Sequence, residues 1–110
     1  MNIQIFGKPK SFDTKKAERY FKERRIRFQA IDLAKYGISR GELTSVLRSV
    51  PLADLVDPKH PDAPLLAHLA YDQDKVEKLL EDPTLLQAPI VRNGKQATVG
   101  YQPQVWQQWE

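Results

Sequence analysis

The chain has 110 residues, a net charge of +3 and a hydrophobic content of 41%, which suits one globular domain with a modest core. It contains no cysteine, so the composition excludes disulfides, thiolate catalysis and thiolate metal sites. No apolar run is long enough for a membrane helix, and the N-terminus lacks the apolar segment of a signal peptide. The composition therefore predicts a cytoplasmic protein that does not enter a membrane.

Charge is unevenly distributed along the chain. Residues 1–48 hold 12 Lys/Arg and 5 Asp/Glu, whereas residues 49–110 hold 5 and 9. A basic N-terminal half suits nucleic acid, an acidic protein surface or an anionic small molecule, although a solvated helix face explains the same pattern. The two histidines, His60 and His68, have no cysteine or third histidine beside them, so we expect no metal site.

The first third of the chain predicts a strand, a helix and a second strand. Residues 2–6 alternate polar and apolar side chains, as in a strand with one buried face. A helix follows over residues 12–25, and either Ser11 or Asp13 can cap its first turn. A second run of strand character covers residues 26–33. A strand–helix–strand unit of this length is nearly always right-handed and places its two strands in parallel.

The two faces of the first predicted helix differ. Ala17, Tyr20 and Phe21 share the inward stripe of a packed helix. The outer face is basic, and Glu18 is spaced to form an ion pair with Lys22. The basic residues of this helix and of its end are candidates for contact with a partner: Lys15, Lys16, Arg19, Lys22, Arg24 and Arg25. In the second strand, the side chains expected on one apolar face are Ile26, Phe28 and Ala30.

The middle of the chain, residues 39–82, is predicted as a small helical insertion. Its first helix, over residues 40–49, begins with the spacing of a capping box, a serine followed three residues later by a glutamate. A proline-rich loop separates this helix from the last one, which Asp72 or Asp74 can cap and which runs to Glu81. Prolines and capping residues thus divide the insertion into short helices.

The end of the chain predicts a hairpin and a closing helix. Two β-rich runs, residues 89–92 and 96–99, flank an Asn-Gly pair, which is a strong hairpin signal. The last helix, over residues 104–109, carries Trp106 and Trp109. We expect these tryptophans to close the core, and an exposed patch for self-association that also includes Tyr101 is the alternative.

Together these elements predict a single α/β domain with the thioredoxin-like plan. A mixed sheet of about four strands is flanked by helices, with the helical insertion between the second strand and the C-terminal hairpin. Residues 1–38 and 83–110 would form the thioredoxin-like core around the insertion. Pro89 stands where such folds carry a cis-proline opposite the loop between the first strand and helix.

Three segments resemble the ArsC/Spx family, the arsenate-reductase-like branch of the thioredoxin fold. The opening Phe6-Gly7-x-x-x-Ser11-x-x-x-Lys15-Lys16-Ala17 is similar to the family's aromatic-Gly-x-x-x-Cys-x-x-x-[Lys/Arg]-Lys-Ala motif. Ala88-Pro89-Ile90-Val91 is similar to its Arg-Pro-Ile/Leu segment, and residues 94–106 look like its hairpin and closing helix. The ordered resemblance covers nearly the whole chain.

The first departure from the family concerns its nucleophile. Ser11 stands where the family has its redox cysteine. A hydroxyl has no accessible anion at neutral pH and no thiol redox chemistry. We therefore expect no catalytic residue in this chain, with Ser11 as a vestigial position.

The second departure concerns the arginines that hold the oxyanion in arsenate reductases. Their positions correspond to Ala88 and to residues near Asp57 and Tyr101 in this chain. Arg48 and Arg92 are the candidates to replace a lost arginine. Loss of the nucleophile together with these cations argues against a serine that substitutes in the same reaction.

Two functions follow from the resemblance. The first, which we expect, is a non-redox binding or regulatory module, because Spx-type members bind RNA polymerase at the C-terminal domain of its α polypeptide. The basic first helix would then contact RNA polymerase or another protein, with nucleic acid also open, through Lys15, Lys16, Arg19 and Lys22. The second is an oxidoreductase relative whose cleft binds glutathione or an oxyanion at the helix start. Its cleft candidates are Lys10, Ser11, Phe12, Asp13, Ala88 and Pro89, and no other cofactor is expected.

Overall fold

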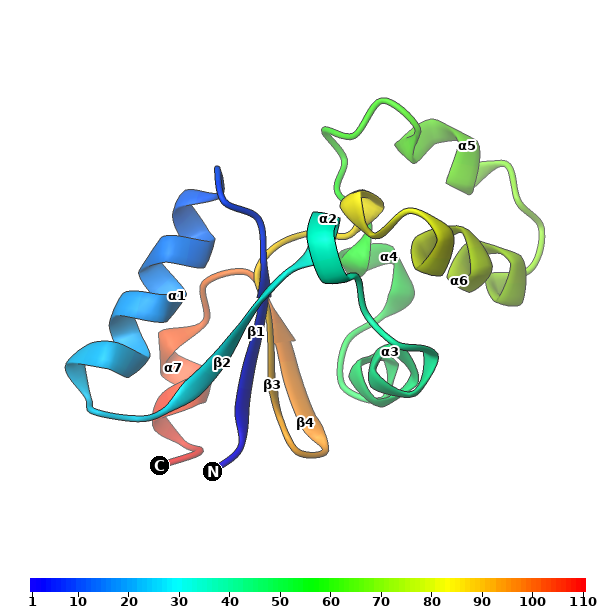
Figure 1. Cartoon of the computed structure of the whole chain (residues 1–110). Helices are drawn as coiled ribbons and strands as arrows, with labels where there is room; N and C mark the ends of the chain where they lie inside the picture. Colours follow the sequence, from blue (N-terminus) through cyan, green and yellow to red (C-terminus); the bar gives the residue numbers. More distant parts are fainter.

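The computed structural model describes residues 1–110 and contains one mixed four-stranded sheet in the order β2-β1-β3-β4 (Figure 1). β1 (Ile3–Gly7) pairs in parallel with β2 (Phe28–Asp32) and in antiparallel fashion with β3 (Ile90–Asn93). β3 continues through the predicted hairpin into β4 (Gln96–Val99). The predicted mixed sheet and its parallel first pair are confirmed.

Helices cover both faces of the sheet. One face is covered by α1 and α7, and the other by the helices between β2 and β3 (Figure 1). The predicted position of the insertion is thus confirmed. Every helix is too short or too polar to span a membrane. The helices are α1 (Phe12–Glu23), α2 (Leu33–Tyr36), α3 (Arg40–Leu47), α4 (Leu52–Leu55), α5 (Ala63–Ala67), α6 (Asp72–Glu81) and α7 (Pro103–Gln107), with a 3₁₀ helix η1 (Pro83–Leu85).

β1 is buried on both faces, unlike the one-sided strand predicted from its alternation. Ile3 and Ile5 pack in the core under α1, whereas Phe6 packs in the larger core under the insertion. The difference arises because β1 is a central strand with helices on both sides. Gly7 then lies against Thr14 of α1, where any side chain would collide with the threonine methyl.

The smaller core is organised around Trp106, which is fully buried. Its indole N–H donates to Thr98 Oγ1 at 2.8 Å, and its ring lies 5.2 Å from the ring of Tyr20 in an edge-on arrangement. Trp109 is partly buried against the same cluster, and Tyr101 packs edge-on against Trp106. The predicted core role of the tryptophans is confirmed, and they form no exposed apolar patch.

Three local predictions for the first half of the chain were wrong. α1 ends at Glu23 rather than at residue 25, because Arg25 adopts a left-handed backbone with φ of 57°. Ala30 is exposed on the edge strand β2, and Ile31 is the residue that packs against the larger core. Glu18 does not form the expected ion pair with Lys22.

The helix caps agree with the sequence in two of three cases. Ser11 caps α1, and Ser39 and Glu42 form the predicted capping box of α3. α6 instead begins at Asp72 with Tyr71 in the cap position and no side-chain cap, so neither Asp72 nor Asp74 caps it. The peptide bond before Pro89 is cis, as predicted.

Replacing Gly7 with alanine tests the contact between β1 and α1. The added methyl group meets the Thr14 side chain, so we expect Gly7→Ala to lower the free energy of unfolding by about 1–3 kcal/mol. Gly41→Ala is the matched control because a methyl group there meets no atom within 4 Å. It should leave the stability unchanged or raise it by up to about 1 kcal/mol in urea unfolding. Equal effects of the two variants would contradict the close contact.

Candidate binding cleft at the start of α1

A cleft of about 530 Å³ opens where the loop between β1 and α1 faces the segment that follows α4. Of the predicted cleft residues, five line it, namely Lys10, Ser11, Phe12, Asp13 and Ala88. Pro89 is buried and does not line it. The cleft is also lined by side chains that were not predicted there, above all Lys8 and Lys59. Lysines in loops give no periodic signal, so only the folded chain shows where they lie.

Ser11 acts as the N-cap of α1. Its Oγ accepts a hydrogen bond from the Thr14 N–H at 3.1 Å, and its own N–H donates to the Lys8 carbonyl at 3.0 Å. Thr14 Oγ1 in turn accepts the Lys8 N–H at 3.3 Å. These bonds satisfy donors that a helix start leaves free. The serine hydroxyl thus has a structural partner at the helix start.

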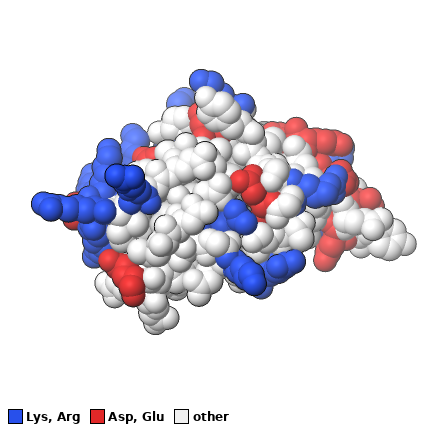
Figure 2. Space-filling view, turned by 60° about the horizontal axis from the view of Figure 1, so that its bottom comes forward, with Lys and Arg blue, Asp and Glu red and all other residues white.

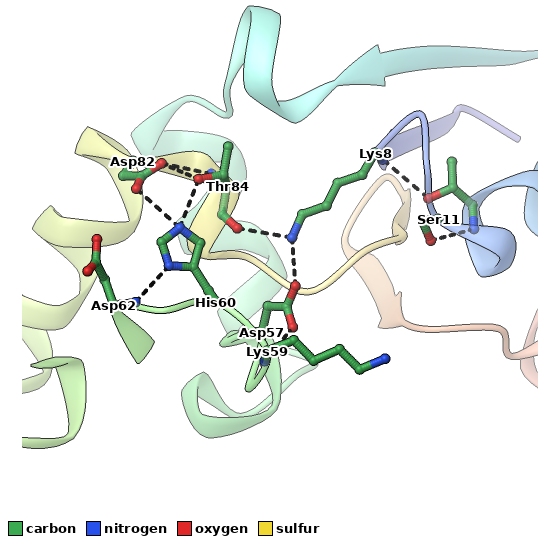
Figure 3. A network of polar contacts seen from close by, with 9 residues as sticks. Lys8, Ser11, Asp57, Lys59, His60, Asp62, Asp82 and Thr84 are labelled. Carbon is green, nitrogen blue, oxygen red and sulfur yellow. Dashed lines mark hydrogen bonds and ion pairs between the residues drawn. The ribbon is translucent and has the colours of Figure 1, made fainter. Parts of the chain in front are cut away.

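The ammonium group of Lys8 is held by an ion pair within the cleft. Lys8 Nζ lies 2.9 Å from Asp57 Oδ2 and donates to the Thr84 carbonyl at 3.0 Å (Figure 3). Partial burial favours the neutral form of the Asp57 carboxyl. Hydrogen bonds from Lys8 and from the Lys59 N–H outweigh that effect and hold the pKa of Asp57 below its usual value. The Lys8 ammonium, which could otherwise attract an anion into the cleft, is therefore already paired with Asp57.

The remaining charges of the cleft are mixed. Lys10 and Lys59 are exposed and form no ion pair, whereas Asp13 adds a negative charge at the helix start. No arginine lines the cleft. Arg48 and Arg92 lie instead beside α3 and the β3–β4 turn, so neither replaces a lost arginine. The cleft lacks the bidentate donors that bind oxyanions most tightly.

A second polar cluster lies next to the cleft, around His60 (Figure 3). Its Nε2 is 3.1 Å from Thr84 Oγ1 and 3.5 Å from Asp82 Oδ2, and its Nδ1 accepts the Asp62 N–H at 3.0 Å. A metal on Nε2 would require a proton on Nδ1, which would oppose the Asp62 N–H. The possible ligand atoms of His60, Asp62 and Asp82 lie within 4.8 Å of one another. Their hydrogen bonds nevertheless favour a structural role, in which His60 connects the proline-rich loop to η1.

The four basic residues predicted to contact a partner are all exposed on α1: Lys15, Lys16, Arg19 and Lys22. None lies within 4.0 Å of a carboxylate. Arg24, in contrast, packs 3.7 Å above the Tyr20 ring and lies 3.8 Å from the Glu110 carboxylate. Figure 2 shows basic side chains gathered at the α1 end of the molecule and acidic ones at the opposite end, over α6. The α1 cations are thus available to an acidic surface.

Comparison with known proteins supports the predicted resemblance. The model of the ArsC family matches residues 66–109, which include α6, the hairpin and α7. No curated protein matches the chain in sequence. The family match is thus carried by the C-terminal part of the chain.

Solved structures extend the likeness over the whole chain. An arsenate reductase from Vibrio cholerae is 23% identical with a TM-score of 0.82, and 97% of each chain is covered. A protein from Bacteroides fragilis that is described as ArsC family related is 16% identical with a TM-score of 0.86, covering 100% of this chain and 98% of that one. An arsenate reductase related protein from Brucella melitensis is 21% identical with a TM-score of 0.63, covering 99% and 94%. At these identities the likeness establishes the thioredoxin-like fold of ArsC proteins.

Asp57→Asn tests the ion pair that occupies the cleft. Loss of the carboxylate leaves the largely buried Lys8 ammonium with neutral acceptors only, so we expect a loss of about 2 kcal/mol in unfolding free energy at pH 7. Folding lowers the pKa of Asp57. The stability that the ionised carboxylate contributes is therefore fully present above the pKa of about 3.9 that an aspartate has in the unfolded chain. That stability is lost as the pH falls through the lower pKa of Asp57 in the folded protein. The difference between wild type and variant should therefore shrink below about pH 4.

The control for that measurement is Glu81→Gln, which removes the exposed pair between Lys78 and Glu81 at 3.4 Å. We expect a change within about 0.5 kcal/mol. A loss in Asp57→Asn that stays the same at pH 3 and pH 7 would show that the ion pair is not its source.

Proposed function

We propose that this chain, an ArsC-like protein in fold and in its C-terminal sequence, is a non-redox binding or regulatory module. The observation that carries the proposal is the state of the α1 start. Ser11 caps the helix where the resemblance would place the family's cysteine, and the chain holds no cysteine. Lys8 is paired with Asp57, so the cleft is shaped by contacts within the chain.

The partner surface in this proposal is the outer face of α1. Lys15, Arg19 and Lys22 recur at spacings that place them along one side of the helix, and Lys16 adds a fourth exposed cation. Their charges are not neutralised within the chain, which suits an acidic surface of RNA polymerase or of another protein. The resemblance to Spx-type members supports a protein partner of this kind.

Charge reversal on α1 tests the partner surface. We expect the triple variant Lys15→Glu, Arg19→Glu and Lys22→Glu to lose partners that the wild-type protein captures from cell extract, because each reversal turns attraction into repulsion. Quantitative mass spectrometry of the captured proteins is the measurement. A loss of at least tenfold is expected for a partner bound through this face.

The matched control reverses three cations on other elements, Lys35, Lys75 and Lys78, and changes the net charge by the same amount. It should retain the partners that the α1 variant loses. Identical partner lists for wild type and the α1 variant would remove the proposal.

The alternative is a cleft that binds a small anion or glutathione, as an oxidoreductase relative would. The cleft volume of about 530 Å³, its place at the start of α1 and the unpaired cations Lys10 and Lys59 favour it. The similar solved structures described as an arsenate reductase and as an arsenate reductase related protein also favour this alternative. Asp13 and Asp57 oppose it, because both place negative charge in the lining.

Calorimetry with glutathione, arsenate, phosphate and sulfate separates the two functions. We expect no heat of binding at millimolar ligand, because the Lys8 ammonium is paired and no arginine is present in the cleft. A saturable heat that Lys10→Glu abolishes would instead establish the alternative. Lys35→Glu, which changes the net charge equally outside this cleft, serves as the control.

The variant Ser11→Cys reports on the remaining electrostatics of the site. The Thr14 N–H and the helix start favour a thiolate there, so we expect the pKa of the introduced thiol to lie below the ordinary cysteine value of about 8.5. Absorbance at 240 nm during pH titration measures it. An ordinary or raised value would show that the acidic lining cancels the helix start.

A further inference from the structure

A basic hollow unrelated to the cleft lies between α3 and the β3–β4 hairpin. It measures about 650 Å³ and has no hydrophobic residue in its lining. We call it the α3–hairpin surface, and its polar side chains are Arg40, Thr44, Ser45, Arg48, Arg92 and Lys95. Near the middle of Figure 2 basic side chains gather, with acidic side chains directly beside them.

Hydrogen bonds hold this surface together across the sheet. The Arg92 guanidinium donates to Gln4 Oε1 at 2.7 Å through Nη1 and to Ser45 Oγ at 3.3 Å through Nε. At the other end, Ser49 Oγ donates to the Lys95 carbonyl at 3.4 Å and joins the end of α3 to the hairpin turn. The cations therefore belong to one supported surface of α3 and the hairpin.

Two cations of this surface, Arg48 and Lys95, are exposed and have no carboxylate within 4.0 Å. Arg40 forms an ion pair at 2.6 Å from Glu77. Arg92 is half-buried, and although burial favours the neutral form of Glu42, hydrogen bonds from Ser39 and Gln4 and the positive charge of Arg92 hold the pKa of Glu42 below its usual value. The hydroxyls of Thr44 and Ser45 lie among these cations.

We propose that the α3–hairpin surface binds the phosphate backbone of double-stranded nucleic acid. Arginine and lysine side chains with hydroxyl donors beside them are the groups that contact phosphates in such complexes. The lining has no aromatic ring on which unpaired bases could stack, which disfavours a single strand. Binding is independent of base sequence.

The test is fluorescence anisotropy with labelled duplex DNA and duplex RNA of mixed sequence, titrated over a range of salt concentrations. We expect saturable binding of wild type at low salt. Arg48→Glu combined with Lys95→Glu should weaken it at least tenfold and reduce the slope of log K against log salt by about 2, one unit for each lost phosphate contact. Arg92 is left unchanged because it also holds Gln4 and Ser45.

The matched control is Lys35→Glu combined with Lys75→Glu, which changes the net charge by the same amount on α2 and α6, outside both the α3–hairpin surface and α1. It should weaken binding less than threefold. Equal losses in the two double variants would show that net charge alone attracts the duplex, and tighter binding of a single strand or of poly-glutamate would also overturn the proposal. The capture experiment on α1 is independent of this result, because the two surfaces share no residue.

Discussion

The burial of β1 on both faces connects the two cores of this protein. Ile5 contributes to the core under α1 and α7, and Phe6 contributes to the core under the insertion. Both side chains are almost inaccessible to solvent, so a change in this strand would disturb both layers. The strand ends at Gly7, whose missing side chain lets Thr14 and the start of α1 approach the sheet. The candidate cleft begins at this point.

The contacts at the α1 start explain how an ArsC-like fold can persist without a thiol. Ser11 satisfies the Thr14 N–H, a task for which serine is well suited. The Lys8–Asp57 pair joins the α1 loop to the segment after α4, and the Lys8 bond to the Thr84 carbonyl extends the connection to η1. The His60 ring extends this network, because its Nε2 contacts both Thr84 and Asp82. The start of α1 therefore serves as a structural connection between the β1–α1 loop, the segment after α4 and η1.

Basic charge occurs on two surfaces that differ in kind. On α1 the cations project from a single helix along its outer face, and Arg24 at its end is already engaged with Tyr20 and Glu110. On the α3–hairpin surface, Arg92 is held by Gln4 and Ser45. A fixed guanidinium loses less side-chain entropy when it binds, whereas the exposed lysines of α1 suit electrostatic attraction of a partner. The two surfaces thus support separate proposals.

Local chemistry in the sequence determined the features that depend on near neighbours. The serine cap, the capping box of α3, the Asn-Gly hairpin and the inward stripe of α1 follow from spacing within a few residues. The absence of thiol chemistry follows from composition alone. Tertiary structure decided what depends on distant partners: Lys8 meets Asp57 across 49 positions, Arg92 contacts Ser45 rather than the cleft, and Ala30 is exposed because β2 is an edge strand. Such contacts arise only when the sheet order brings separate loops together, and no periodicity in the chain encodes that order.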